Sequence, residues 1–409
     1  MPLLARAGKR RYRAVMRGLL APFALIAAAT VAPSAAEPPA SVAVVFDRHA
    51  ITPVLTEGLA DRATGRRVTA DDPVRIASIS KLVTTLGVMR MVDAGTLDLD
   101  RDVSHYLGWS LRNPAFPDKM ITLRLLLSHQ SSLRDGPDLY IIPLGDTLRS
   151  RLSDSRVWDA GHAPGSGWFH YTNLNFPVVA SVMEAASGER FDRLMQHLVL
   201  KPLRLKACYN WSGCSADAVS RAVVLYRASG EVAKDDLKGQ LPCPVVTAEG
   251  AACDLAGYSP GWNGALFSPQ GGLRISMRDL ARIGRLLARQ GKGFISAARY
   301  RQMTRPQWQF NGTNGQGEQG LEVSIFCSYG LGLHQIGSGA NQCHDELFGD
   351  GTARLGHSGD AYGLKSGLWW DPVSGKGIAF FTTAVSETET GHRSAFTARE
   401  EALVDRVRR

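Results

Sequence analysis

Ser78 and Lys81 are the residues of this 409-residue sequence whose types and spacing point most directly to chemistry. They form a Ser-x-x-Lys segment at the head of the apolar run 76–92. Residues three positions apart share one face of a helix, so the hydroxyl and the ammonium can meet there. A serine hydroxyl becomes a strong nucleophile when a neighbouring base takes its proton, and a desolvated lysine with a lowered pKa can be that base. The same spacing also fits a helix-capping serine followed by a surface lysine, so both interpretations stay open at this point.

Tyr171 and Asn173 form a second candidate pair, after the turn that Pro164-Gly165 predicts. In an extended loop, residues two positions apart point to the same side. A phenol with a lowered pKa beside Lys81 could pass the serine proton to a leaving group, and an asparagine amide could hold the lysine or a substrate carbonyl. Without further context, the pair also fits an ordinary half-buried tyrosine in a loop.

The third candidate segment is Gly356-His357-Ser358-Gly359-Asp360. Within it, residues 357–360 are the candidates for substrate binding. Glycine there would let a substrate lie close against a strand edge, where backbone groups can bind it. The backbone N–H of Asp360, together with that of Ser78, could form an oxyanion hole, and His357 would line the cleft and bind substrate. Without context, the histidine fits a structural polar residue at a strand end equally well.

The elements that must position these residues are strands at both ends of the chain and helices between them. Residues 40–70 predict two or three strands, the first over 41–46, and the helix that carries Ser78 ends near Gly95. From about 101 to 256 the pattern is helical with long loops, and 207–258 predicts an irregular excursion held by disulfides.

Capping residues and turn residues place the other elements. Thr122 predicts an N-cap, Gly188 ends a helix over 177–187, a further helix covers 191–200, and Ser276 caps a helix over 277–289. Strands are predicted over 353–357, 364–370 and 377–384, with turns at 359–363 and 371–375 and a last helix over 394–407. Strands at both ends around a helical middle predict one sheet built from both termini, with a helical lobe inserted.

Taken together and in this order, the three motifs resemble the serine β-lactamase and penicillin-binding-protein superfamily, in particular its class C β-lactamase-related branch with D-aminopeptidases and carboxylesterases. The resemblance covers roughly residues 40–384. Further landmarks support it: Leu126 to Leu133, Pro164-Gly165, Gly271-Gly272-Leu273 before a Ser-x-x-Asp-Leu helix, and Trp369-Trp370-Asp371-Pro372. It implies an α+β, β-lactamase/transpeptidase-like fold, with an antiparallel sheet flanked by helices. The α/β lobe would comprise 37–100 and 265–409, and the mostly helical lobe 101–264.

The resemblance also implies a two-step acyl transfer without a metal or organic cofactor. Ser78 would attack a carbonyl, and Lys81, coupled to Tyr171, would take the proton. The family's third motif is Lys-Thr-Gly, whereas this chain has His357 at its start, and a histidine is mostly neutral at pH 7. That difference favours ester or small-peptide substrates over β-lactams. A rival motif, Lys365-Ser366-Gly367, is rejected because it falls in the returning strand. Ser132 stands where relatives usually have glycine.

The leading functional hypothesis is therefore a serine hydrolase of carboxylesterase or D-amino-acid peptidase type acting on small molecules. A β-lactamase or D-alanyl-D-alanine carboxypeptidase is the alternative within the enzymes. A catalytically inactive protein that binds wall peptides is the second alternative. The complete set of Ser78, Lys81 and Tyr171 argues against it, because binding alone does not need all three.

Composition and charge indicate an exported globular protein. The formal net charge is +9, but residues 1–36 hold six basic and no acidic residues, which leaves +3 for the rest and no reason to propose nucleic acid as a partner. A basic stretch, an apolar run over 18–32 and the small residues 34–36 predict a cleaved signal peptide over 1–36. We expect a periplasmic or secreted protein with no stable membrane span after cleavage.

The six cysteines all lie in the exported part and fall into three close couples. An even number of cysteines in an oxidising compartment favours disulfides. We predict the pairs Cys208–Cys214, Cys243–Cys253 and Cys327–Cys343. A zinc site is the weaker alternative, because no C-x-x-C pair and no neighbouring histidine at ligand spacing is present.

Overall fold

A computed structural model describes residues 38–316, 325–337, 339 and 343–408 of the chain. The predicted signal peptide at 1–36 lies outside the described residues.

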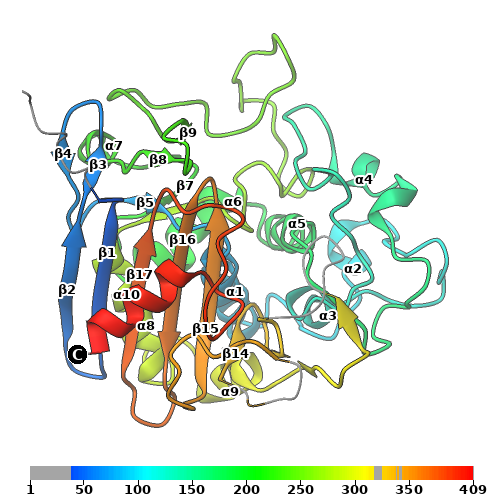
Figure 1. The fold of residues 1–409 in the computed structure, drawn as a ribbon. Helices are drawn as coiled ribbons and strands as arrows, with labels where there is room; N and C mark the ends of the chain where they lie inside the picture. The colour runs from blue at the N-terminus through cyan, green and yellow to red at the C-terminus, as the bar shows by residue number, and fades with distance from the viewer. Residues whose placement is uncertain (1–37, 317–324, 338, 340–342, 409) are drawn as a thin grey trace, which may run out of the picture. The chain divides into compact units, whose positions relative to one another are not determined.

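One antiparallel sheet joins strands from both ends of the chain (Figure 1). Its order is β11 (Trp308–Gln309), β13 (Ser328–Tyr329), β14 (His334–Ile336), β15 (Arg354–Ala361), β16 (Leu364–Trp370), β17 (Gly377–Thr382), β1 (Ser41–Phe46) and β2 (Ile51–Glu57). β1 pairs with β17 from Ser41↔Thr382 to Phe46↔Gly377. The predicted sheet built from both termini is therefore confirmed.

Alternation along β1 gives each face of the sheet its own core. Val42, Val44 and Phe46 face the large apolar core, which also contains buried residues of α1 (Ile79–Asp93) and α8 (Met277–Ala288). Ala43 points the other way, into a smaller cluster with residues of α10 (Ala398–Arg408). Figure 1 shows α10 across one face of the sheet, with α1 and α8 behind it. Helix α1, which carries the candidate nucleophile, thus packs against the sheet.

Between these parts the chain is mostly helical with short strands. Its elements are α2 (Ser104–Leu107), α3 (Leu123–Leu127), α4 (Leu148–Arg151), η1 (Ser155–Val157), β6 (Phe169–His170), α5 (Asn175–Ser187), α6 (Phe191–Met195), η2 (Gln196–Leu200), β7 (Cys208–Tyr209), α7 (Ala216–Ser220), β8 (Leu225–Tyr226) and β9 (Val232–Lys234). The other described elements are β3 (Leu59–Asp61), β4 (Arg66–Arg67), β5 (Val74–Arg75), β10 (Leu273–Ile275), α9 (Ala297–Thr304) and β12 (Gly315–Gln316). Thr122, Gly188 and Ser276 cap helices as predicted. The division into two lobes stays a prediction.

Three sequence predictions are wrong in detail. Residues 40–70 form four strands, not two or three, because β3 and β4 make an extra short hairpin. β15 continues through Ala361, so the turn predicted over 359–363 shrinks to Tyr362 and Gly363. Both have positive φ, +58° and +75°, as a two-residue hairpin turn requires. Helix α10 begins at Ala398 rather than near residue 394.

All three predicted disulfides are confirmed: Cys208–Cys214, Cys243–Cys253 and Cys327–Cys343. Three disulfides fit a protein that folds in an oxidising compartment. In the described part of the chain, every helix is too short or too polar to cross a membrane.

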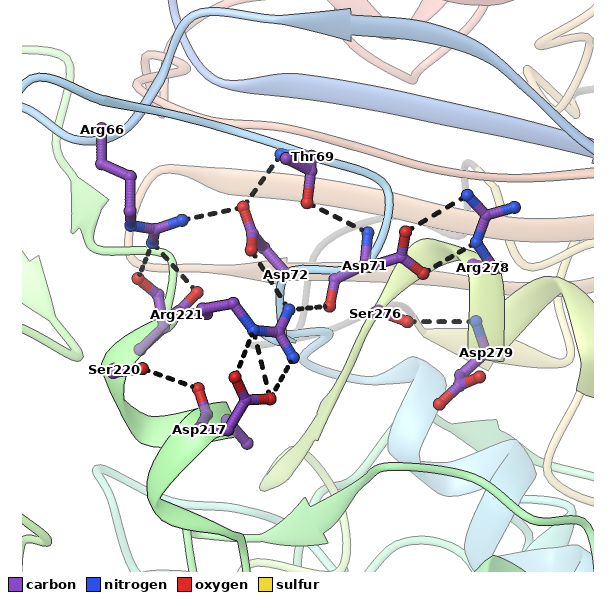
Figure 2. A network of polar contacts seen from close by, with 12 residues as sticks. Arg66, Thr69, Asp71, Asp72, Asp217, Ser220, Arg221, Ser276, Arg278 and Asp279 are labelled. Carbon is purple, nitrogen blue, oxygen red and sulfur yellow. Dashed lines mark hydrogen bonds and ion pairs between the residues drawn. The ribbon is translucent and has the colours of Figure 1, made fainter.

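A polar network holds the segment that leads into β5 and α1 (Figure 2). The Asp72 carboxylate accepts hydrogen bonds from Arg66 Nη1 (2.9 Å), Thr69 N (2.9 Å) and Arg221 Nη1 (3.4 Å). Beside it, Asp71 accepts from Arg278 Nε of α8 at 2.7 Å. The network ties residues 66–72, which precede β5 and Ser78, to α7 and α8.

We expect Asp72→Asn to lower the free energy of unfolding by about 2 to 3 kcal/mol, because it leaves two arginines without their buried anion. The Asp72 side chain is only 2% exposed. Asp217→Asn is the matched control: this carboxylate pairs with the same Arg221 but is 65% exposed, so its loss should cost below about 1 kcal/mol. Urea unfolding of both variants measures the difference, and equal losses would contradict the role of burial.

Candidate active site

Ser78 stands at the N-cap of α1, but its side chain makes no capping hydrogen bond. Instead, Ser78 Oγ accepts a hydrogen bond of 2.9 Å from Lys81 Nζ. Lys81 is completely buried, so it is not a surface lysine. The geometry thus disagrees with the helix-capping interpretation and places the two candidate groups in direct contact.

The backbone just before Ser78 passes close to β15 and β16 and is strained. Ala77 has a φ of +48°, a left-handed conformation that non-glycine residues rarely adopt. A Cβ added to Gly359 of β15 would lie 2.3 Å from Ile76 O, so no other residue fits there without a shift. Ser366 Oγ donates to the same carbonyl at 3.1 Å. Gly359 therefore lets the sheet approach the protein's own backbone before Ser78, and its contact with substrate stays a prediction.

Lys81 also brings the second motif into the site. Its Nζ donates to Asn173 Oδ1 at 2.7 Å and to Gln270 O at 3.3 Å. The same nitrogen lies 4.8 Å from the ring centroid of Tyr171, which is buried. The structure thus brings together the four residues predicted from the first two motifs: Ser78, Lys81, Tyr171 and Asn173. They are up to 95 positions apart in the sequence. Their catalytic roles stay predictions.

Asp135 is a residue of this site that the sequence did not point to. Its carboxylate accepts three hydrogen bonds, from Asn173 N (2.9 Å), Asn173 Nδ2 (2.8 Å) and Leu174 N (2.8 Å). Burial raises the pKa of Asp135, while the two backbone N–H groups and Lys81 act in the opposite direction. Because Asp135 holds Nδ2, the amide oxygen of Asn173 is turned toward Lys81. No motif or periodicity around residue 135 could have revealed this role.

We expect Asp135→Asn to lower kcat by about 10- to 100-fold with little change in KM, because an amide at 135 cannot accept the same set of bonds and lets Asn173 turn. Asp138→Asn in the same loop is the control, since that residue is exposed. Steady-state kinetics on an ester substrate measure both variants. A KM effect alone would assign Asp135 to substrate binding instead of positioning.

His357 lies in a series of buried hydrogen bonds. His129 Nδ1 accepts from Thr172 N at 3.0 Å, so its Nε2 carries the proton and donates to Tyr329 Oη at 3.2 Å. The phenol in turn donates to His357 Nε2 at 2.9 Å. The remaining proton of His357, on Nδ1, points to Ser358 O at 2.6 Å. The bonding pattern defines one neutral tautomer for each imidazole.

Burial lowers the pKa of His357 well below its ordinary value, with His334 and Lys81 adding to the effect. The side chain is fully buried. His357 therefore does not line an open cleft as expected, because its ring nitrogens are occupied by Tyr329 and the backbone. Substrate contact by His357 stays a prediction.

The other residues of the third motif lie along β15. Ser358 N donates to His334 Nε2 at 3.4 Å. The Asp360 carboxylate forms an ion pair with Lys365, its cross-strand partner on β16. Lys365 thus lies on the returning strand, which agrees with rejecting it as a motif residue. An oxyanion hole from the backbone N–H groups of Ser78 and Asp360 stays a prediction.

A cavity of about 360 Å³ adjoins the cluster. Gln270 belongs to its wall and also accepts the Lys81 hydrogen bond through its carbonyl, which connects the cavity to the site. Arg75 and Tyr362 line it as well. A larger cavity of about 650 Å³ lies over β1, β2, β17 and α10 and contains none of the motif residues. We therefore assign the site to the smaller cavity.

Among the described residues, no group of three or more histidine, cysteine, aspartate or glutamate side chains could hold a metal ion.

Comparisons with known proteins extend these observations. A family model described as Beta-lactamase matches residues 27–403. The chain is 29% identical to esterase EstB of Burkholderia gladioli over 260 residues, which are 59% of this chain and 64% of the esterase. It is 32% identical over 143 residues to the D-alanyl-D-alanine-carboxypeptidase/endopeptidase AmpH of Escherichia coli K12, covering 33% of this chain and 36% of that protein. The alignments span less than two thirds of either relative.

Solved structures share the fold across most of the chain. A class C beta lactamase from Rhodobacter sphaeroides has a TM-score of 0.63 at 17% identity, over 91% of this chain and 94% of that one. The D-amino acid amidase from Ochrobactrum anthropi SV3 has a TM-score of 0.61 at 17% identity, over 91% and 93%. At this identity the likeness concerns the fold alone, and it confirms the predicted α+β class.

Proposed function

Since this chain belongs to the beta-lactamase family and is a serine hydrolase, we propose that it cleaves ester or amide bonds of small substrates through a covalent acyl-enzyme on Ser78. The observation that carries this proposal is the 2.9 Å hydrogen bond between Lys81 Nζ and Ser78 Oγ, inside a cluster that includes Tyr171 and Asn173.

Each step of the proposed reaction has a group to perform it. For the first step Lys81 must be a neutral amine, so that the Ser78 hydroxyl donates along the 2.9 Å contact. Ser78 Oγ then attacks the carbonyl carbon while its proton passes to the Nζ lone pair, directly or through Tyr171. The backbone N–H groups of Ser78 and Asp360 stabilise the negative oxygen. When the intermediate collapses, the bond to the leaving group breaks and that group takes up the proton. Water then attacks the acyl-enzyme, which releases the acid and restores the serine hydroxyl.

Esters and small amides are favoured over β-lactams as substrates. A permanent cation at the start of the third motif would attract the carboxylate of a penicillin, whereas His357 is buried and its pKa is lowered by that burial. The alternatives are a β-lactamase or D-alanyl-D-alanine carboxypeptidase, and an inactive protein that binds wall peptides. The esterase likeness supports the first proposal.

We further propose that the protein is exported to the periplasm or the medium. The three disulfides support this location, and the predicted signal peptide over 1–36 would direct the export.

Intact-mass spectrometry after exposure to a fluorophosphonate tests the acyl-enzyme proposal. Ser78 Oγ should bond to phosphorus as fluoride leaves, which adds one phosphonyl group to the wild type and none to Ser78→Ala. Ser110→Ala, at an exposed serine, is the control and should react like the wild type. Absence of an adduct on folded, disulfide-intact protein would overturn the hydrolase mechanism and favour the wall-peptide binder. If an adduct forms, a panel of esters, D-alanyl peptides and cephalosporins separates the enzyme alternatives.

A further inference from the structure

Arg75 is a cation near the proposed nucleophile that feels the charge of Asp235 but forms no direct ion pair with it among the described residues. It ends β5, three residues before Ser78, and it lines the cavity of about 360 Å³. In the described part of the chain, no hydrogen bond or ion pair joins its guanidinium to another residue, and its Nε is buried and unsatisfied. Its recorded side-chain contact is with the ring of Tyr362, whose centroid lies 5.0 Å from Arg75 Cζ. Arg75 as a whole is only partly buried, but its guanidinium lacks the directly bonded carboxylate that a charge withdrawn from water normally has.

The neighbouring carboxylates are already engaged elsewhere. Arg274 holds both oxygens of Asp235, with Nη2–Oδ1 at 2.9 Å and Nε–Oδ2 at 3.2 Å. Asp236 lies 3.7 Å from Lys238. A second cation of the cavity wall, Lys234, lies 5.7 Å from the ring of Tyr362. The cavity wall therefore places two cations without a direct ion pair, Arg75 and Lys234, near the same aromatic ring.

Burial is the main reason why the pKa of Arg75 falls to about 10, and the like charge of Arg274 adds to it. The guanidinium still keeps its proton at neutral pH. A bound anion would offset both the desolvation and the repulsion from Arg274.

We propose that Arg75 recognises a carboxylate on the substrate, so that the enzyme acts on small esters or amides that carry a negative charge away from the cleaved bond. The inference rests on the proposed acyl-enzyme function and names its substrate class. A planar guanidinium matches a carboxylate with two parallel hydrogen bonds. This recognition is independent of the third motif, where His357 is buried and neutral. Apolar wall residues such as Ile142, Val245 and Leu266 would hold the chain between the charge and the carbonyl.

Two matched pairs of esters test the proposal and locate the charge. Mono-4-nitrophenyl glutarate and its methyl ester differ by one carboxylate on the acyl side, whereas 4-acetoxybenzoate and its methyl ester differ on the leaving side. Values of kcat/KM, corrected for spontaneous hydrolysis, are compared for wild type, Arg75→Gln, Arg75→Lys and Arg301→Gln. Arg301 is exposed and lies outside the cavity, so it is the charge-matched control.

We expect the wild type and Arg301→Gln to prefer the anionic member of at least one pair by about 10- to 100-fold, which is the range of a charge-assisted hydrogen bond. Arg75→Gln should lose this preference but still cleave the neutral esters, and Arg75→Lys should keep part of it. Ser78-dependent cleavage without any preference in the wild type, or a preference that survives in Arg75→Gln, overturns the proposal and leaves the hydrolase function intact. Absence of both turnover and the fluorophosphonate adduct overturns both.

Discussion

Lys81→Met is expected to lower kcat/KM for ester substrates by about a thousandfold or more, with the fold retained. Methionine has a similar length and suits a fully buried position, but it can neither take nor return a proton. Ser78 Oγ and Asn173 Oδ1 would also lose the donor that holds them at 2.9 Å and 2.7 Å. Because the serine and the lysine act as one unit, the double variant Ser78→Ala/Lys81→Met should be no slower than the slower of the two single variants.

Lys365→Met is the matched control for this prediction. Lys365 belongs to the Lys-Ser-Gly segment that lies on β16, and its partner is the exposed Asp360 carboxylate. We expect kcat/KM of Lys365→Met to remain within about threefold of the wild-type value, as for the loss of a surface ion pair. The rate of phosphonylation by the fluorophosphonate gives a second readout without turnover. A large loss in Lys365→Met with a small loss in Lys81→Met would show that the wrong lysine has been assigned to the chemistry.

Much of the fold could be predicted because the relevant information is local. The β1 strand over Ser41–Phe46 and β16 over Leu364–Trp370 were predicted with their observed bounds, since β-branched and aromatic runs end at clear turn residues. The three disulfides followed from close spacing along the chain. Ser78 and Lys81 were found for the same reason, because one turn of helix brings them together.

The rest of the site depends on contacts between distant segments. The Gln270 carbonyl reaches Lys81 across 189 positions, and Tyr329 meets His357 from a neighbouring part of the sheet. Asp135 acts through Asn173, so its role exists only after the loop has folded. Contacts between such distant segments produce no regular spacing of residues in the sequence, so neither secondary-structure propensity nor hydrophobic periodicity can reveal them.

Ser132 is a residue that differs from the expected family pattern, and the structure shows how its backbone conformation is stabilised. The family resemblance leads us to expect glycine there, and the structure gives Ser132 a φ of +61°, a conformation that favours glycine. The strain is offset in part because Ser132 Oγ accepts a hydrogen bond of 2.9 Å from Asn113 Nδ2. The departure is therefore accommodated by one side-chain contact.

The second large effect concerns acid stability and originates in buried histidines around the site. Burial lowers the pKa of His129 and His357 far below the ordinary value, that of His334 to about 3 and that of His170 to about 4. An unfolded histidine titrates near 6.5, so between pH 6.5 and about 4 the unfolded chain binds protons that the folded chain does not. Stability is therefore lost as the pH falls through this window, and His334 alone should account for about 2 kcal/mol of that loss at pH 5.

Two buried glutamates have the opposite effect on stability at low pH. The pH dependence of the whole protein therefore combines both effects, and a variant of one histidine is the sharper test. Burial raises the pKa of Glu184 and Glu400 to about 7, which favours their protonated form in the folded state as the pH falls from 7 toward 4.5. His334→Phe removes one titrating group while keeping an aromatic ring among Tyr329, Phe326 and Trp369.

Urea unfolding at pH 7.5 and at pH 5.0 gives the free energy of unfolding that each protein loses between these two pH values. We expect His334→Phe to lose about 2 kcal/mol less than the wild type. The exposed His105 supplies the control, since His105→Gln should lose as much as the wild type. If His334→Phe instead loses as much free energy of unfolding as the wild type between the two pH values, His334 is protonated in the folded protein at pH 5. The hydrogen bond from Ser358 N to His334 Nε2 would then have to be reassigned, because a protonated imidazole ring cannot accept a hydrogen bond.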